Sequence, residues 1–317
     1  MLLTILLALV GFLLLIKCAD IFVEGAGSLA RNFKISTTVI GLTVVSFGTS
    51  APELAISFNT HLSGNTDMLF GNVLGSSISN ILVILGISIL IKPFKIEHDV
   101  IRKQIPILLL ICLGLSVLLL DTVFTNNPFN SLSRADGLIL LLFFSIFIYY
   151  LITVIQNDKK NNHSSTPAKY KPMRSLMMVL FGLIGILVGS HLIVDNVETL
   201  ATAIGISQKI ISITVISIGT SLPELVTTVV AAKKGENSMA IGNIIGANIF
   251  NICVVLGLPV VLLGEATTTA FTIIDMFFIV LSVVLLWICS ATAREIKRKE
   301  ALLFLIIFAV YMGYVVF

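Results

Sequence analysis

Charged residues are scarce in this sequence: Asp, Glu, Lys and Arg make up 12% of its 317 residues, while 57% are hydrophobic. An average soluble domain carries about 25% charged residues. With half of that share, the chain cannot cover the surface of a soluble globule with polar groups. Disorder is excluded as well, because disordered segments have low hydrophobicity. The composition, with a mean hydropathy of +1.07, is therefore that of a polytopic membrane protein.

Other residue types are also too sparse or too scattered to support enzyme chemistry. The four cysteines stand singly in apolar stretches without metal-ligand spacing, and His61, His98 and His191 are isolated. Ser50 or Ser221 could serve an intramembrane hydrolase only with a base nearby in sequence, and none is present. No Walker motif suggests ATP use, and the net charge of +3 implies no nucleic-acid partner. We therefore expect neither an enzyme nor a cofactor.

Long apolar runs fill the chain instead. A bilayer core requires about 20 apolar residues per helix. The first run lacks the basic segment and cleavage site of a signal peptide, so we interpret it as a span. The predicted fold class is an all-α polytopic membrane protein with ten transmembrane helices. They lie near residues 2–26, 38–59, 69–91, 105–120, 136–155, 176–195, 210–231, 239–263, 268–290 and 301–317.

The basic residues give these ten spans an orientation. Of the 20 Lys and Arg residues, 17 fall in one set of alternating loops, and only Arg134 and Lys209 fall in the other, with Lys17 inside the first span. Cytoplasmic loops carry the excess of Lys and Arg. We expect a multi-pass protein of the plasma or inner membrane, with both termini outside the cytoplasm and the lipid bilayer as its partner. A monomer is compatible with this plan, and the sequence leaves the oligomeric state open.

An internal repeat divides the chain. Residues 43–54 read TVVSFGTSAPEL and residues 214–225 read TVISIGTSLPEL, with nine of twelve positions identical at an offset of 171. The same offset aligns Asn72 with Asn243 and Asn80 with Asn251. The predicted organisation is a first five-helix repeat at 1–155, a cytoplasmic linker at 156–175 and a second, inverted five-helix repeat at 176–317. Five spans per half is an odd number, so the halves enter the membrane from opposite faces. Inverted repeats of this kind are a common plan of secondary transporters, with the site at the repeat interface.

A polar stripe runs along the second and the seventh span, at intervals of three and four residues. Because lipid cannot face such a stripe, it must face protein or a water-filled path. The residues of the two stripes are Ser46, Thr49, Ser50, Glu53 and Ser57, and Ser217, Thr220, Ser221, Glu224 and Thr228.

Each stripe contains a proline and a glutamate side by side. Pro52 and Pro223 lack an N–H, which frees the carbonyls of Gly48 and Gly219 four residues earlier, so carbonyl, hydroxyl and carboxylate oxygens are expected to converge there. A charge at the middle of a span costs about 2.5–3.5 kcal/mol, and Glu53 and Glu224 would also repel each other at a symmetric site. A divalent cation removes both penalties, and Ca²⁺ accepts 6–8 oxygen ligands. The alternative, a protonated glutamic acid with a purely structural role, is disfavoured by the recurrence of the whole motif.

The third and eighth spans add amide and hydroxyl oxygens. Asn72, Ser76 and Asn80 share one helix face, and Asn243, Ala247 and Asn251 occupy the matching places, while Ser77 and Asn248 lie on a second face. For Asn80 and Asn251 a ligand role is favoured, and for Asn72 and Asn243 a role in holding helices together. Asp20, Glu24 and Asp195 are read as structural or interfacial, with Lys17 and Asp20 paired on the first helix.

The paired GTSAPE (48–53) and GTSLPE (219–224), each followed by G-N-x-x-G and a further Asn, resemble the α-repeats of the calcium/cation antiporter superfamily. Within it, the chain resembles the short prokaryotic sodium/calcium exchangers. The resemblance implies a cluster of Ca²⁺ and Na⁺ sites between spans 2, 3, 7 and 8, across which spans 1 and 6 slide. The residues it assigns to these sites are Glu53, Glu224, Thr49, Thr220, Ser50, Ser221, Ser46, Ser217, Asn80 and Asn251, and the shared helix face adds Ser76.

One position departs from part of that superfamily. Some members, including potassium-dependent exchangers, carry an acid where this chain has Asn251, so two carboxylates remain instead of three. K⁺ co-transport is thereby disfavoured. The leading hypothesis is antiport of Ca²⁺ against Na⁺ by alternating access. H⁺/Ca²⁺ exchange remains open because buried glutamates can carry protons, and a cation channel is a less favoured alternative.

Overall fold

The chain is helical apart from four two- or three-residue strands, in a computed structural model that describes residues 2–124, 128–160, 167–204, 217–293 and 295–316. Among these residues, seven helices are long and apolar enough to cross a membrane, and one bent pair makes an eighth if it is a single span. The helical class and the apolar character predicted from composition are therefore confirmed. The short strands were not predicted.

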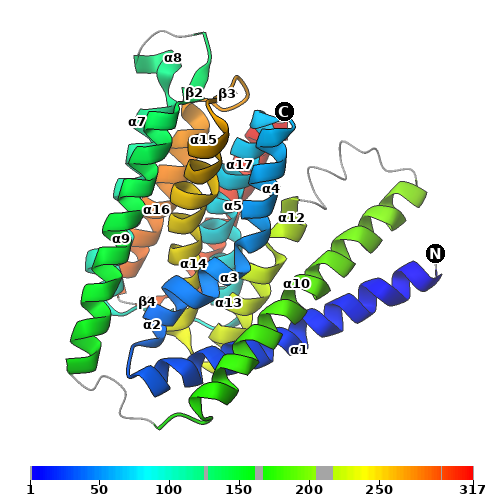
Figure 1. The fold of residues 1–317 in the computed structure, drawn as a ribbon, viewed down its shortest axis with the longest axis vertical. Coiled ribbons are helices and arrows are strands. Elements are labelled where there is room, and N and C mark those ends of the chain that lie inside the picture. Colours follow the sequence, from blue (N-terminus) through cyan, green and yellow to red (C-terminus); the bar gives the residue numbers. More distant parts are fainter. Residues whose placement is uncertain (1, 125–127, 161–166, 205–216, 294, 317) are drawn as a thin grey trace.

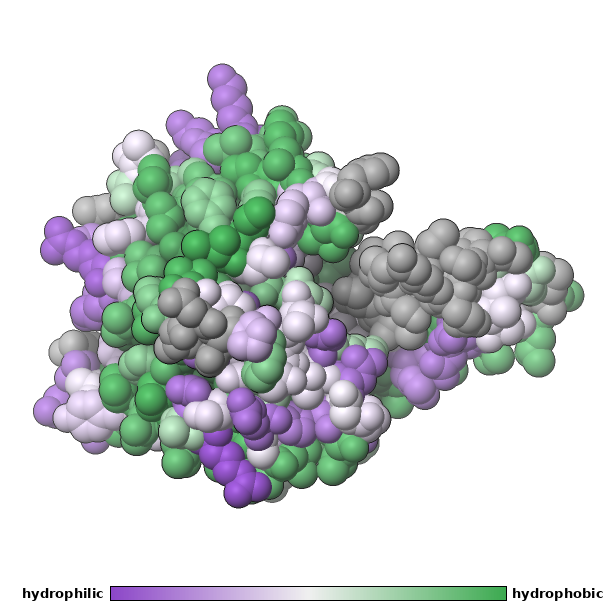
Figure 2. Space-filling model, turned by 90° about the horizontal axis from the view of Figure 1, so that it is seen from above, coloured by the Kyte–Doolittle hydropathy of each residue, from purple (hydrophilic) through white to green (hydrophobic). Residues whose placement is uncertain are grey.

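Two long helices form an arm that leaves the main bundle at an angle (Figures 1 and 2). They are α1 (Leu2–Phe33) and α10 (Pro172–Ala203). Glycines bring them together, because a Cβ at Gly182 would lie 2.8 Å from the Phe22 backbone and one at Gly189 2.8 Å from the Leu15 nitrogen. Both helices are longer than predicted: α1 continues seven residues past position 26, and α10 starts before 176 and ends after 195.

Two broken helices carry the repeated motif. The first comprises α2 (Thr37–Ile40), the π-helical turn η1 (Gly41–Val45), α3 (Ser46–Thr49) and α4 (Ala51–Leu62), and it bends by 44° between α3 and α4. The second comprises α12 (Ser217–Thr220) and α13 (Leu222–Lys234). The breaks fall at Ser50 and Ser221, whose φ and ψ are −85° and 9°, and −89° and 2°. Pro52 and Pro223 sit in the first turn after each break, where the missing N–H costs least.

Two further helices each contain a π-helical turn in the middle. The first unit is α5 (Thr66–Ser79), η2 (Asn80–Leu85) and α6 (Gly86–Ile91). The second is α14 (Asn237–Phe250), η5 (Asn251–Leu256) and α15 (Gly257–Leu263). Both π-helical turns begin at the asparagine predicted as a ligand. Such turns are frequent at functional sites because they redirect side chains and backbone groups.

The remaining described helical elements complete the bundle, and α7, α9 and α16 lie on its left in Figure 1. They are η3 (Val100–Gln104), α7 (Ile105–Leu119), α8 (Asp121–Phe124), α9 (Arg134–Lys160), α16 (Ile273–Ala293) and α17 (Arg298–Val316).

Short strands tie the loops together at the two ends of the bundle. β1 (Phe94–Lys95) pairs antiparallel with β4 (Glu295–Ile296), and β2 (Asn130–Leu132) pairs antiparallel with β3 (Ala266–Thr268). β2 and β3 lie at the top of Figure 1, and β4 lies near the opposite end. β1 and β3 each follow the helix unit that contains a π-helical turn. Equivalent connections of the two halves therefore pair at opposite ends of the molecule.

Close backbone contact joins the first broken helix to α14. A Cβ at Gly242 would lie 2.6 Å from the Thr38 carbonyl oxygen, and one at Gly246 would lie 2.7 Å from the Leu42 carbonyl oxygen. Gly41 approaches the Met239 carbonyl in the same way, at 2.5 Å. Because these glycines carry no Cβ, the two backbones can approach closely. The contact sets the distance between the broken helix and the helix that carries Asn251.

Candidate cation-binding site

Glu53 and Glu224 are both buried, with 1% of each residue exposed. Each lies in the first turn of the helix that follows a break, α4 for Glu53 and α13 for Glu224. A helix N-terminus carries partial positive charge and unpaired N–H groups, which favour a nearby carboxylate. The two breaks therefore place both carboxylates where the backbone supports negative charge inside the protein.

The two motifs meet in space. The Ser50 hydroxyl donates a hydrogen bond to Oε1 of Glu224 at 3.0 Å, across 174 residues of sequence. The motif of one half therefore completes the surroundings of the glutamate of the other half.

The predicted amide ligands are held across the same interface. Nδ2 of Asn80 donates to Oδ1 of Asn248 at 2.9 Å, and Nδ2 of Asn251 donates to Oγ of Ser76 at 3.2 Å. Both asparagines are 1% exposed. In each amide the nitrogen therefore donates to a residue of the opposite half, and the side-chain oxygen has no hydrogen-bond partner.

Among the described residues, nine buried side-chain polar atoms have no hydrogen-bond partner, and four of them are oxygens of predicted ligands: Oε2 of Glu53, Oε2 of Glu224, Oδ1 of Asn80 and Oδ1 of Asn251. An unsatisfied buried polar atom costs about 1–3 kcal/mol, and more if it is charged. These four atoms come from symmetry-related positions, and none of them carries a proton when both glutamates are ionised. Oxygen-only ligands with two negative charges suit Ca²⁺ and Na⁺ better than zinc, which prefers nitrogen and sulfur.

The hydroxyl groups of the first motif line the same region. Thr49 is fully buried, and its hydroxyl donates to the carbonyl oxygens of Val45 at 3.1 Å and Ser46 at 3.3 Å. The Ser46 hydroxyl donates to the Thr43 carbonyl oxygen at 3.4 Å. Because these protons are used within their own helix, the oxygen lone pairs of both hydroxyls remain available to a cation.

The second motif is described less completely. Ser221 is buried and Thr220 is half-buried. For Ser217 the structure describes the backbone in α12, and the side chain lies outside the described part. Residues 205–216, which include Lys209 and the start of the predicted seventh span, also lie outside it.

The carbonyl that Pro223 frees has a partner on the arm. The hydroxyl of Ser190, on α10, donates to the Gly219 carbonyl oxygen at 2.9 Å. The sequence predicts that this carbonyl lies among the cation ligands. In this conformation, the hydrogen bond from Ser190 to the carbonyl attaches α10 to the broken helix.

Asn72 and Asn243 clamp the glutamate-bearing helices. Nδ2 of Asn72 donates to the Glu53 carbonyl oxygen at 3.1 Å and to Oγ of Ser57 at 3.2 Å. Nδ2 of Asn243 donates to Oγ1 of Thr228 at 2.9 Å, and position 228 is the repeat equivalent of position 57. These contacts hold the helices together, which is the role that the sequence favoured for these two asparagines.

The charges near the arm pair differently from the sequence prediction. Asp20 forms an ion pair with Lys234 at 2.9 Å, so the predicted Lys17–Asp20 pair is wrong. A partner three residues away on the same helix was the visible candidate, but Lys17 is exposed and Lys234 approaches from α13. Asp195 lies 3.2 Å from Nε2 of His191, one turn away on α10.

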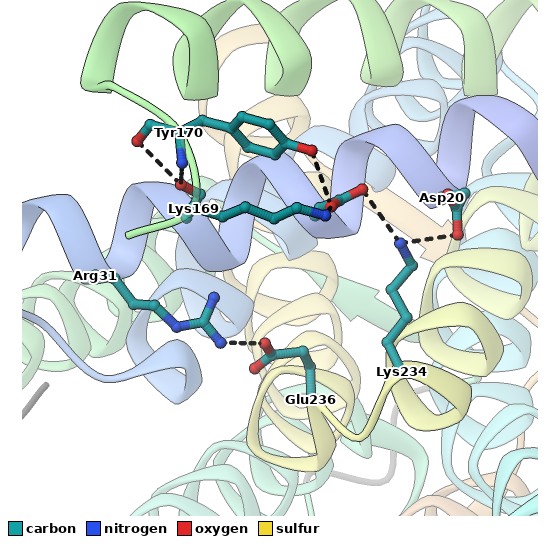
Figure 3. Close-up of polar contacts among 8 residues, drawn as sticks. Asp20, Arg31, Lys169, Tyr170, Lys234 and Glu236 are labelled. Atoms are coloured by element: carbon teal, nitrogen blue, oxygen red, sulfur yellow. Dashed lines mark hydrogen bonds and ion pairs between the residues drawn. The ribbon is translucent and has the colours of Figure 1, made fainter. Parts of the chain in front are cut away.

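A polar cluster connects α1 to the end of α13, to the start of α14 and to the segment before α10 (Figure 3). Arg31 pairs with Glu236 at 2.5 Å, and Lys234 also approaches Glu24 at 3.6 Å. Glu24 further contacts Lys169 and the Tyr170 hydroxyl, and the hydrogen bond to Glu24 raises the pKa of Lys169. Asp20 and Glu24 therefore have structural roles here, as expected.

These features define a helical membrane protein with an oxygen-lined, doubly acidic centre between two repeated motifs. Residues 3–153 and 174–317 match the family "Sodium/calcium exchanger protein". The chain is 37% identical over 313 residues to the inner membrane protein YrbG of Escherichia coli, covering 96% of this chain and 94% of that protein. It is 29% identical to the sodium/calcium exchanger MaX1 of Methanosarcina acetivorans, covering 97% of each.

A solved structure agrees with these sequence matches. The sodium-calcium exchanger NCX_Mj, in a crystal soaked with Na⁺ and without Ca²⁺, superposes with a TM-score of 0.84 at 32% identity over 98% of each chain. The chain belongs to the sodium/calcium exchanger protein family, and the resemblance drawn from the GTS-x-PE motifs is confirmed.

Proposed function

We propose that this protein is a secondary antiporter that exchanges Ca²⁺ for Na⁺ across the cell membrane by alternating access. The observation that carries the proposal is the set of four unpartnered, buried oxygens on Glu53, Glu224, Asn80 and Asn251. Family membership and the names of MaX1 and NCX_Mj support Ca²⁺ and Na⁺ as the ions. Ser46, Thr49, Ser50, Ser76, Ser217, Thr220 and Ser221 complete the proposed ligand set. Transport uses the ion gradient, without cofactor or ATP.

Two features support the inverted ten-span plan behind alternating access. The described elements fit ten membrane passages when each broken or π-interrupted unit counts as one. The pairing of β1 with β4 and of β2 with β3 at opposite ends is what a two-fold axis in the membrane plane requires. In this plan the halves are 1–155 and 176–317, and the 156–175 linker joins them.

Charge balance supports a competition between the two ions. Two carboxylates are neutralised by one Ca²⁺ or by two Na⁺, so either load removes the penalty of burying the charges of Glu53 and Glu224. Asn251 supplies a neutral amide oxygen where a third acid would demand another cation. K⁺ is therefore not expected to be required.

Ca²⁺ uptake into proteoliposomes tests the proposal directly. We expect uptake when Na⁺ is loaded inside, saturation with external Ca²⁺, and little uptake when a K⁺ gradient replaces the Na⁺ gradient. Uptake driven equally well by a pH gradient alone would replace Na⁺ with H⁺ as the counter-ion. Flux that needs no counter-ion and does not saturate would make the protein a channel and overturn the antiport proposal.

The distribution of basic residues supports an orientation with the linker and the polar cluster of Figure 3 on the cytoplasmic side. Both termini then face outward. A periplasmic alkaline phosphatase fused after residue 317 should be active, whereas the same fusion inside residues 156–175 should be inactive. The reverse pattern would contradict the orientation.

The ion pair between Arg31 and Glu236 gives a prediction about the moving parts. It joins the arm to the start of α14 and is partly exposed, so it contributes at most about 1 kcal/mol. Arg31→Glu should lower the maximal exchange rate by up to about fivefold, because it destabilises the conformation described here relative to others. The Ca²⁺ KM should stay within twofold, since the site is untouched.

Restoring the pair with exchanged charges is the control. The double variant Arg31→Glu/Glu236→Arg should recover most of the rate, and Lys103→Glu, which breaks an exposed pair with Asp99, should leave it unchanged. An Arg31→Glu variant with the normal rate would show that this contact does not bias the transport cycle.

A further inference from the structure

We propose that Asn248 is a positioning residue that fixes the direction of the Asn80 amide, so that its carbonyl oxygen and not its NH₂ group faces the cation. The proposal rests on the proposed function, because it concerns how the same site selects positive charge. Asn248 lies on α14, three residues before Asn251, and it is 1% exposed. Its position in the repeat corresponds to Ser77, so only one half has an amide there.

A backbone carbonyl determines the orientation of the whole chain of hydrogen bonds. The Ser77 carbonyl oxygen can only accept, and Nδ2 of Asn248 donates to it at 3.1 Å. This contact leaves Oδ1 of Asn248 pointing toward Asn80. Since Oδ1 can only accept, the group of Asn80 that meets it at 2.9 Å must be Nδ2. Oδ1 of Asn80 is therefore turned the other way, where it is buried without a partner.

Burial prevents the Asn80 amide from adopting the opposite orientation. Ser77, Asn80 and Asn248 are all 1% exposed or less, so no bulk water competes for their polar groups. A rotated Asn80 amide would set its oxygen against the Asn248 oxygen and lose the bond between them. It would also present two N–H donors to the cation. The fixed backbone carbonyl excludes both outcomes.

The equivalent contact in the other half constrains the direction of the Asn251 amide less. Asn251 donates to Oγ of Ser76, whose hydroxyl donates to the Val73 carbonyl oxygen at 3.1 Å. A hydroxyl can rotate and exchange donor and acceptor roles, whereas the Asn248 amide cannot do so without losing its backbone bond. Asn248 is therefore the residue whose loss should affect the ligand direction most.

The test is the apparent KM for Ca²⁺ in Na⁺-loaded proteoliposomes. Asn248→Leu keeps a similar volume but removes the acceptor, and we expect the KM to rise about tenfold, as the loss of one buried hydrogen bond corresponds to about a tenfold change. Asn248→Ala removes the same acceptor without adding bulk and should show the same direction. Ser77→Ala is the matched control: its hydroxyl serves the Val73 carbonyl, while the Ser77 carbonyl that holds Asn248 is retained.

The same substitution made in an Asn80→Asp protein distinguishes a positioning role of Asn248 from a merely structural one. In Asn80→Asp the side chain has two equivalent oxygens and no N–H to hold, so adding Asn248→Leu should change the KM by less than twofold or lower it. An equal rise of KM in both backgrounds, or no rise in either Asn248 variant, would overturn the proposal. If wild type and Ser77→Ala themselves showed no Na⁺-driven Ca²⁺ uptake, the proposed function would fail instead, and the two failures are distinct.

Discussion

Glu53→Gln and Glu224→Gln should each lower Na⁺-driven Ca²⁺ exchange at least about 100-fold. Each variant removes one of the two negative charges that a Ca²⁺ ion neutralises in a region closed to water, where charge–charge interactions are strong. The shape of the side chain is preserved, so the helix break and the packing of α4 and α13 should survive. The measurement is initial Ca²⁺ uptake per protein molecule in proteoliposomes, with folding checked by size-exclusion chromatography.

A matched acid outside the site controls for general loss of charge. Asp99 is exposed, and among the described residues its ion-pair partner is Lys103 one turn away, so Asp99→Asn should exchange Ca²⁺ like wild type. If correctly folded Glu53→Gln and Glu224→Gln proteins exchanged as fast as the Asp99→Asn protein, the assignment of the site would be wrong.

Gly246→Ala should damage both stability and transport. The new Cβ would lie 2.5 Å from Oγ of Ser46 and 2.7 Å from the Leu42 carbonyl oxygen. The backbone contact cannot yield without moving α14 or the first broken helix. Overpacking of this kind costs about 1–3 kcal/mol, and the displaced segment includes Ser46 of the proposed site. We expect a melting temperature several degrees lower and at least about a tenfold loss of exchange.

The repeat itself provides the control for this prediction. Gly75 is the equivalent of Gly246 in the first half, and no described atom lies within 4 Å of a Cβ placed there. Gly75→Ala should therefore change the melting temperature little. Equal melting temperatures for Gly246→Ala and wild type would show that the α14 contact is looser than the structure indicates.

The sequence predicted the parts of the site that lie within one motif. A glutamate beside a proline in an apolar span is visible locally, and the repeat at an offset of 171 shows that there are two of them. The break at each motif also follows from local chemistry, because proline cannot donate to the preceding turn. The helical class follows from composition and run length alone.

Contacts between elements far apart in the chain were beyond the sequence. Asn248 was noted only as part of a second polar face, because nothing local shows that its oxygen meets Asn80 168 residues away. Lys17 stood as the partner of Asp20 for the same reason: Lys234 is distant in sequence. The lengths of α1 and α10 were underestimated because their polar ends look like loop. The extended end of α1 is helical where Arg31 pairs with Glu236 and where Asn32 donates a hydrogen bond to Ser175 at the start of α10.

The Gly219 carbonyl has a hydrogen-bond partner that the local sequence does not show. Pro223 does lie where it frees that carbonyl, but the hydroxyl that satisfies it comes from Ser190 on the arm. A carbonyl freed in a broken helix must find a donor or a cation. In this conformation it finds the donor, which couples α10 to the site.

Direct Ca²⁺ binding to the purified protein at increasing Na⁺ tests the central claim, that both ions share the oxygens between the two motifs. Calorimetric titration should show saturable Ca²⁺ binding whose apparent Kd rises more steeply than the first power of the Na⁺ concentration, because more than one Na⁺ must leave. The Glu53→Gln/Glu224→Gln double variant should bind no Ca²⁺ at the same concentrations. Ca²⁺ binding that is independent of Na⁺, or that persists in the double variant, would contradict the account.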